Sequence, residues 1–102
     1  MIPREICGLD QKVQELLLNV FNRDEKIISA HLFGSRAMGN FKTGSDIDIV
    51  LTAPDLSHQE YLRLQTTLDD LLLPYKIDLI LSHEIENDRL LEHIAEFKVR
   101  LK

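Results

Sequence analysis

The fold class follows chiefly from two short apolar segments that each carry aspartate near their first residue. Residues 46–52 read Asp-Ile-Asp-Ile-Val-Leu-Thr, and residues 76–81 read Lys-Ile-Asp-Leu-Ile-Leu. Short runs with this content of β-branched side chains are typical of strands in the centre of a sheet. Side chains at i and i+2 of a strand point to the same face, about 7 Å apart, so Asp46 and Asp48 should project together while Ile47 turns into the core.

The segments around these runs have the periodicity of amphipathic helices and of one more strand. Residues 9–21 place apolar side chains at helical spacing, which predicts a helix. Residues 27–33 are rich in β-branched and aromatic side chains and stop at a glycine, which predicts a strand and a turn. Ser57 and Glu60 match a capping box at the start of a second helix, which Pro74 stops. The apolar residues that we assign to the buried face of this second helix are Tyr61, Leu64, Leu68, Leu71 and Leu72.

The C-terminal tail contains both kinds of periodicity. Leu90, Ile94 and Phe97 recur at helical spacing, whereas Val99 and Leu101 alternate with basic residues, so the pattern leaves open whether the chain ends as helix or strand. The resulting order is helix, strand, loop, strand, helix, strand, helix. This order predicts an α/β or α+β fold, a small mixed sheet of about three strands with helices packed on it, as a single domain over residues 1–102.

Composition excludes several classes of protein. A chain of 102 residues with 44% hydrophobic and 28% charged side chains is expected to fold around one core. Its formal charge of −5 opposes the binding of a long nucleic acid. No run approaches the roughly 20 apolar residues of a membrane span, and no apolar signal segment begins the chain. The single cysteine, Cys7, suits a reducing compartment, so we expect a cytoplasmic protein.

The aspartates form the candidate catalytic site. If the strand that carries Asp78 lies beside the strand of Asp46 and Asp48, three carboxylates meet, and their mutual repulsion calls for a bound cation. Carboxylate oxygens without histidine or cysteine at ligand spacing favour Mg²⁺, which completes its coordination with water and substrate phosphates. Such a site performs phosphoryl or nucleotidyl transfer, in which one metal activates the acceptor hydroxyl and the other holds the leaving group.

A bend before the aspartates is the candidate phosphate site. Gly34 permits close approach of the backbone, and the amides and the Ser35 hydroxyl that follow can hold phosphate oxygens. A P-loop is excluded, because Asn40 stands where that motif needs lysine. An EF-hand is excluded as well, because Val50 and Leu51 stand where its loop needs an oxygen ligand and a glycine.

Other polar residues in this region have weaker functional signals. Arg36 is equally compatible with binding a phosphate or partner and with a solvated or ion-paired role. We interpret Lys42 and Lys76 as surface charges and Ser45 as a loop hydroxyl that supports the following aspartate. His31 is expected to be a packed or half-exposed strand residue, because no acidic partner or second metal ligand is visible near it in the sequence.

The combination of these motifs resembles a known family. Gly34 and Ser35, a ten-residue gap, the Asp46 and Asp48 pair and Asp78 on a later strand look like the signature of the polymerase-beta-like nucleotidyltransferase superfamily. Within this superfamily, the chain most resembles the minimal, single-domain (MNT) branch. The residues that carry this resemblance are Gly34-Ser35-Arg36-Ala37-x-Gly39 and Ser45-Asp46-Ile47-Asp48. The resemblance implies the nucleotidyltransferase fold, two Mg²⁺ ions on Asp46, Asp48 and Asp78, and Gly34 and Ser35 at the phosphates of ATP. It also implies that Asp78 helps to activate the attacking hydroxyl. The chain departs from the usual pattern of the family where Phe97 follows Glu96 in place of a glycine.

Many members of this branch resemble antitoxins encoded beside a HEPN-domain ribonuclease. The resemblance implies transfer of AMP from ATP to a tyrosine of that toxin, or a complex with it, and hence a hetero-oligomer. So short a chain leaves no residues for a separate acceptor-recognition domain, so the leading hypothesis is a transferase whose acceptor is a protein partner. Two alternatives stay open: a non-catalytic antitoxin that masks its toxin, and an adenylyltransferase that acts on a small molecule.

Overall fold

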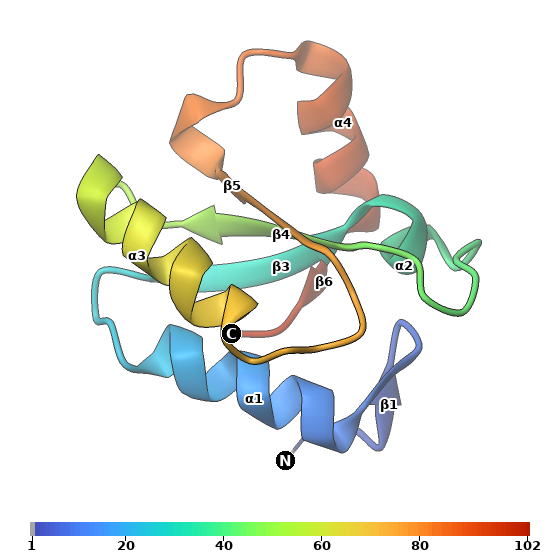
Figure 1. Cartoon of the computed structure of the whole chain (residues 1–102). Coiled ribbons are helices and arrows are strands. Elements are labelled where there is room, and N and C mark those ends of the chain that lie inside the picture. Colours follow the sequence, from blue (N-terminus) through green and yellow to red (C-terminus); the bar gives the residue numbers. More distant parts are fainter. Residues whose placement is uncertain (1) are drawn as a thin grey trace.

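The computed structural model describes residues 2–102 and contains a mixed sheet with helices on both faces (Figure 1). Within the described residues, no helix is long and apolar enough to cross a membrane. The elements in chain order are β1 Glu5–Ile6, β2 Leu9–Asp10, α1 Gln11–Asn22, β3 Ser29–Phe33, α2 Gly34–Met38, β4 Ile47–Thr52, α3 His58–Asp69, β5 Ile77–Leu81, the 3-10 turn η1 Ser82–Glu84, α4 Asp88–Phe97 and β6 Val99–Arg100.

The main sheet has the strand order β5-β4-β3-β6. Strand β4 is antiparallel to β3 and parallel to β5, so the predicted mixed α+β fold is confirmed. A fourth strand is added by the tail, where helix α4 is followed by β6 and Leu32 pairs with Val99. The C-terminal segment therefore contains both structures that its periodicity suggested.

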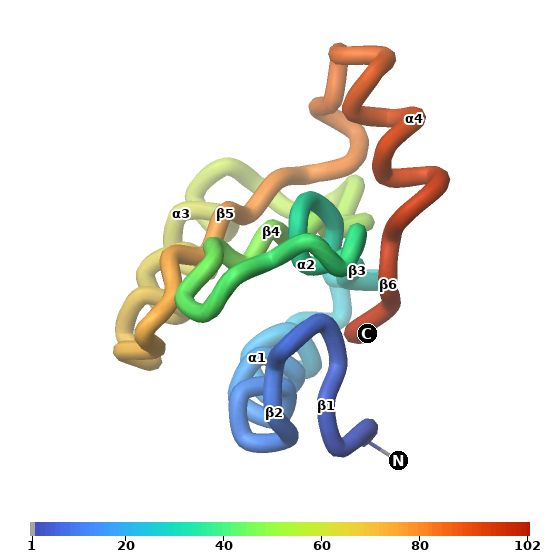
Figure 2. Tube along the Cα trace, turned by 90° about the vertical axis from the view of Figure 1, so that its right-hand side faces the viewer, coloured from blue at the N-terminus to red at the C-terminus, as the bar shows by residue number. Residues whose placement is uncertain are grey.

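The two faces of the sheet bury different sets of side chains. Helices α1 and α3 cover one face, and α4 lies on the other (Figures 1 and 2). On the first face, Ile47, Ile49 and Leu51 of β4 are fully buried, as the alternation in the sequence predicts. On the second face, Val50 packs with Ile94 of α4 in a smaller cluster. Because α4 covers only part of this second face, the aspartates of β4 and β5 stay accessible beside it.

The N-terminal segment begins differently from the prediction. Residues 9 and 10, expected in the first helix, form a two-residue strand that pairs with β1. Gly8 makes the turn with φ of +76°, and Asp10 caps α1 by accepting a hydrogen bond from the Val13 amide at 3.0 Å. Leu9 is buried in the same core as the apolar residues of α1. It therefore continues the hydrophobic pattern of the helix, and the pattern alone does not show where the helix begins.

Helix α3 begins as predicted and ends earlier than predicted. The capping box of Ser57 and Glu60 is present, with both reciprocal hydrogen bonds. The helix ends at Asp69, and Leu72 adopts a left-handed conformation with φ of +54°. The assignment of Leu72 to the buried face was wrong: its side chain is 87% exposed, because the helical period no longer applies after the helix has ended.

Candidate active site

The parallel pairing of β4 and β5 brings two of the predicted aspartates together. Asp48 lies directly opposite Asp78 in the register of the two strands. Asp48 is half-buried, and Asp78 is exposed. The pKa of Asp48 is raised, first by burial and then by the negative charges of Asp78 and Asp46. A carboxylate in this setting is stabilised by any cation that arrives between the strands.

Asp46 lies at the entrance to the same strand. It is exposed and immediately precedes β4, and its charge acts on Asp48. Among residues 2–102, no three acidic, histidine or cysteine side chains are gathered closely enough to hold one metal ion. The structure therefore brings Asp48 and Asp78 into register with Asp46 beside them, without forming a closed cage. Their role as metal ligands stays a prediction.

No salt bridge joins these carboxylates to a lysine, arginine or histidine in the described part of the chain, although the charge of His93 opposes the rise in the pKa of Asp48 as the smallest of its causes. The ion pair found there joins Lys26 and Glu60, whose Nζ and Oε1 atoms are 2.9 Å apart. Lys42 and Lys76 are exposed, in agreement with their interpretation as surface charges. Most of the negative charge of the aspartates is thus left for a ligand to neutralise.

Gly34, the residue after β3 and the first of α2, lies directly against Asp48. Its φ is +72°, a conformation that side chains disfavour, and a Cβ atom at this position would collide with the carboxylate of Asp48. Phe33, which precedes Gly34, is the register partner of Asp48 across β3 and β4. The glycine therefore lets the backbone of the bend lie against the carboxylate, and its place at the phosphates of a nucleotide stays a prediction.

The residues after the bend form a short helix, α2, where a loop was predicted. The carbonyl of Ser35 accepts hydrogen bonds from the amides of Gly39 at 3.0 Å and Asn40 at 3.2 Å, which close the helix. Gly39 ends it in the left-handed conformation, with φ of +84°. A helix of five residues is too short to show a hydrophobic period in the sequence. Ser35, the second residue of α2, is half-buried, and its role at the phosphates stays a prediction.

Arg36 has neither of the roles that the sequence suggested. Its side chain is 3% exposed, so it is neither solvated nor free to bind a phosphate. Nε and Nη2 donate to the carbonyl of Ser45 at 3.1 and 2.8 Å, and Nη1 donates to the carbonyl of Cys7 at 2.9 Å. The guanidinium also lies over the rings of Phe41 and Tyr75. Arg36 therefore fixes the loop that leads into Asp46.

The hydroxyl of Ser45 closes the same loop. Its Oγ accepts a hydrogen bond from the Lys42 amide at 2.8 Å, and its own amide donates to the Lys42 carbonyl at 3.0 Å. This agrees with the predicted supporting role. His31, on β3, is half-buried, and its pKa is lowered mainly by burial, as expected for a packed strand residue.

His93 is the residue at the site that sequence reasoning missed. Its Nε2 accepts a hydrogen bond of 2.8 Å from the amide of Gly34, 59 positions away in the chain. The ring packs edge-on against Phe33 and tilted against Phe97. No local pattern indicated this contact, because it arises only when α4 packs beside α2.

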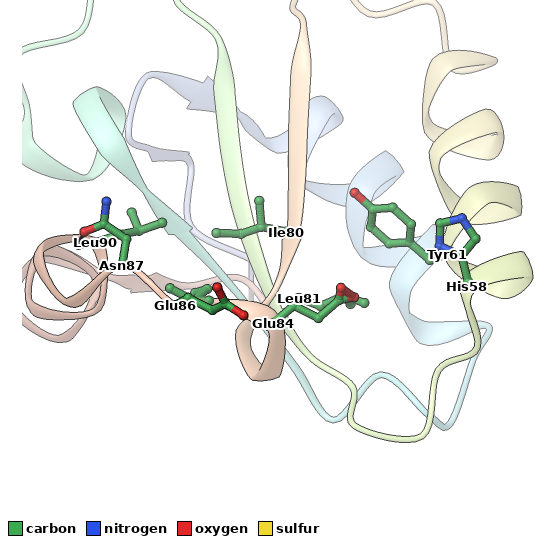
Figure 3. A pocket seen from close by; sticks show the side chains of 9 residues that line it. His58, Tyr61, Ile80, Leu81, Glu84, Glu86, Asn87 and Leu90 are labelled. Carbon is green, nitrogen blue, oxygen red and sulfur yellow. Dashed lines mark hydrogen bonds between the residues drawn. The ribbon is translucent and has the colours of Figure 1, made fainter.

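A cavity of about 480 Å³ lies at the outer edge of β5, apart from the aspartates. Its lining includes His58 and Tyr61 of α3 on one side and Leu90 of α4 on the other, with Ile80 between them (Figure 3). None of the three aspartates lines it. The Tyr61 hydroxyl donates to the Leu79 carbonyl at 2.6 Å and thereby occupies one backbone acceptor at this edge.

Comparison with solved structures supports the fold. A toxin–antitoxin structure with AMP-PNP is similar with a TM-score of 0.70 and 23% identity, over 87% of this chain and 72% of that chain. Tri-AMPylated Shewanella oneidensis HEPN toxin in complex with MNT antitoxin gives a TM-score of 0.65 and 21% identity, over 87% of this chain and 68% of that chain. A putative nucleotidyltransferase from Sulfolobus solfataricus gives 0.55 and 18%, over 85% and 73% of the two chains.

Comparison with families and curated proteins gives the identification. No curated protein matches the sequence closely. The sequence profile of the family described as polymerase beta, nucleotidyltransferase matches residues 15–101, which include all five predicted site residues. The solved structures that resemble the chain include MNT antitoxins paired with HEPN toxins. The chain therefore belongs to the polymerase beta nucleotidyltransferase family.

Proposed function

We propose that this protein is a Mg²⁺-dependent nucleotidyltransferase and the antitoxin of an MNT/HEPN toxin–antitoxin pair. It transfers AMP from ATP to a hydroxyl of a partner protein: the hydroxyl oxygen bonds to the α-phosphorus, the bond from this phosphorus to the β-phosphate oxygen breaks, and pyrophosphate leaves. The observation that carries the proposal is the pairing of Asp48 with Asp78 in register, directly against the Gly34 bend. Family membership supplies the class of reaction. The similar structures with AMP-PNP and with an AMPylated HEPN toxin support the choice of nucleotide and acceptor.

The donor set fits Mg²⁺. Asp46, Asp48 and Asp78 offer hard carboxylate oxygens, and burial and mutual repulsion raise the pKa of Asp48, an effect that a divalent cation reverses. Bound Mg²⁺ supplies charge neutralisation for the triphosphate and a lower pKa for the acceptor hydroxyl. The residues of the chain contribute positioning: the Gly34 amide and the Ser35 hydroxyl donate hydrogen bonds to phosphate oxygens, and Asp78 accepts the proton of the attacking hydroxyl.

A protein acceptor agrees with the charge of the chain. The net charge of −5 repels long nucleic acids, while a folded protein with a complementary surface can approach the exposed aspartates Asp46 and Asp78. Bound Mg²⁺ offsets part of the negative charge that the aspartates and the triphosphate bring together.

The test is a labelling reaction with the product of the adjacent reading frame. The protein is incubated with Mg²⁺, that partner and ATP labelled either at the α- or at the γ-phosphate. We expect label from the α-position alone on the partner, and we expect Asp48→Asn to abolish it. Asp55→Asn, which changes an exposed aspartate in the turn after β4, is the matched control and should label the partner as the wild type does. Label on a small molecule in place of the partner would favour a small-molecule adenylyltransferase.

A second candidate function is that of a non-catalytic antitoxin. It is favoured by the absence, among residues 2–102, of three metal-ligating side chains already gathered around one point. A masking module would form a tight complex with its toxin and inhibit it without transferring label. In that case Asp48→Asn would inhibit the toxin as well as the wild type does, which separates the two functions in one experiment.

A further inference from the structure

The amide that the proposed function assigns to the nucleotide already has a partner within the chain. Gly34 donates to Nε2 of His93 at 2.8 Å, which is a full-strength hydrogen bond. A backbone N–H has one hydrogen to donate, so it cannot make a second bond of this quality to a phosphate oxygen at the same time. The imidazole and a phosphate oxygen therefore compete for one donor.

The position of His93 is fixed by packing, so the contact is not that of a freely rotating surface side chain. The ring is half-buried and lies between Phe33, at a centroid distance of 6.3 Å, and Phe97, at 5.2 Å. Phe33 belongs to β3, whereas His93 and Phe97 belong to α4. The hydrogen bond thus joins α4 directly to the bend beside the aspartates.

Apart from its C-terminal end, which continues into the paired strand β6, the remaining attachment of α4 to the sheet is small. Ile94 is its single buried residue, and it packs with Phe33 and Val50 in the minor hydrophobic cluster. Leu90 joins this cluster only partly buried. A hydrogen bond at the middle of the helix is therefore a substantial part of what holds α4 against the site.

We propose that His93 is a positioning residue that occupies the Gly34 amide until a nucleotide arrives, so that triphosphate binding and the docking of α4 compete for this donor. This inference rests on the proposed function, because it requires a nucleotide at Gly34. When a phosphate oxygen takes the amide, His93 loses its partner, and α4 is held by its apolar contacts and by its continuation into β6, which pairs with β3. Nucleotide binding then loosens α4, which couples the occupancy of the site to a surface on the far side of that helix.

The competition predicts an unusual effect of removing the imidazole. His93→Phe keeps an aromatic ring between Phe33 and Phe97 and removes the acceptor, which leaves the Gly34 amide unpaired until a phosphate binds. We expect this variant to bind Mg²⁺–ATP about 2- to 10-fold more tightly than the wild type, the range that one neutral hydrogen bond contributes. His93→Gln, which restores an acceptor of similar reach, should return the affinity to that of the wild type. His83→Phe, at an exposed histidine of η1, is the matched control and should leave the affinity unchanged.

The experiment combines calorimetric titration with hydrogen exchange of the full chain. Each of the four ribonucleoside triphosphates is titrated with Mg²⁺ into the wild type and the three variants, and amide exchange of residues 88–97 is followed with and without nucleotide. The proposal predicts that nucleotide accelerates exchange in α4 of the wild type, and that it produces no such change in His93→Phe.

The outcomes separate this inference from the proposed function. Equal or weaker nucleotide binding by His93→Phe, with normal binding by the wild type, would overturn the competition and leave the transferase proposal standing. Exchange in α4 that slows on nucleotide binding would also overturn it. If no triphosphate binds to any of the four proteins, the proposed function and this inference both fail.

Discussion

The buried arginine gives the sharpest prediction about stability. In Arg36→Lys the charge and most of the aliphatic stem are kept, but the planar fork that reaches two carbonyls at once is lost. The wild-type guanidinium makes three hydrogen bonds, of 2.8, 2.9 and 3.1 Å, to the Ser45 and Cys7 carbonyls. It also lies 5.1 and 4.8 Å from the ring centroids of Phe41 and Tyr75. An ammonium group cannot satisfy both carbonyls and stack on both rings.

The size of the effect follows from these contacts. Loss of one charge-assisted hydrogen bond costs about 1.5–3 kcal/mol, and loss of two cation–π contacts adds about 0.5–1 kcal/mol each. Because such contributions are not additive, we expect the free energy of unfolding to fall by about 2–4 kcal/mol. In a domain of this size, each kcal/mol lowers Tm by about 4–8 °C.

The assay is urea unfolding followed by far-UV circular dichroism, which suits a chain without tryptophan. With a slope of roughly 1–3 kcal/mol per molar urea, the unfolding midpoint of Arg36→Lys should fall by on the order of 1 M or more. Arg63→Lys, at an exposed position of α3, is the control and should stay within about 0.5 kcal/mol of the wild type. An unchanged midpoint for Arg36→Lys would refute the assignment of Arg36 as the anchor of the loop before Asp46.

Three further predictions concern backbone conformation and pH. Gly34→Ala should lower the free energy of unfolding by at least about 1–2 kcal/mol in thermal melts, because φ is +72° and the new methyl group collides with Asp48; full stability would contradict this. Leu72→Gly should raise the free energy of unfolding by about 1 kcal/mol, because the leucine backbone is strained at φ of +54° and its side chain, 87% exposed, buries almost nothing. A lower Tm would show that the leucine side chain contributes to stability. The pKa of Glu60 is lowered from 4.5 to about 2, chiefly by its hydrogen bond with Lys26, so its contribution to stability is present above pH 4.5 and is lost as the pH falls towards 2. The Tm difference between wild type and Glu60→Gln should therefore shrink over this range, and a difference that stays constant would argue against the shifted pKa.

The sequence predicted the parts of the fold that local physics determines. Alternation of isoleucine and aspartate identified β4 and the buried face that Ile47 and Ile49 share. The capping box identified the first turn of α3, because the side chains of Ser57 and Glu60 each accept a hydrogen bond from the other's backbone amide. Both residues lie within four positions of the chain, so the signal is local. The neighbouring position of Asp78 was inferred only on the condition that β4 and β5 pair, and the parallel register fulfils that condition.

The parts that were missed depend on contacts between distant segments. The two-residue strands β1 and β2 and the five-residue α2 are too short to show a period. The burial of Arg36 depends on Cys7, Phe41 and Tyr75, which converge only in the folded chain. The contact of His93 with Gly34 spans 59 positions, and no local pattern could identify it.

The central claim is that divalent metal binds at the aspartates beside the Gly34 bend, and Mn²⁺ broadening of amide NMR signals tests it most directly. Mn²⁺ replaces Mg²⁺ at carboxylate sites, and its paramagnetism broadens the signals of nearby amides, an effect that falls off steeply with distance from the ion. In the presence of a non-hydrolysable ATP analogue, the account predicts that substoichiometric Mn²⁺ broadens Gly34, Ser35, Asp46, Asp48 and Asp78 before all others. Broadening centred on Glu84 and Glu86, at the cavity beside β5, or no selective broadening at all, would contradict it.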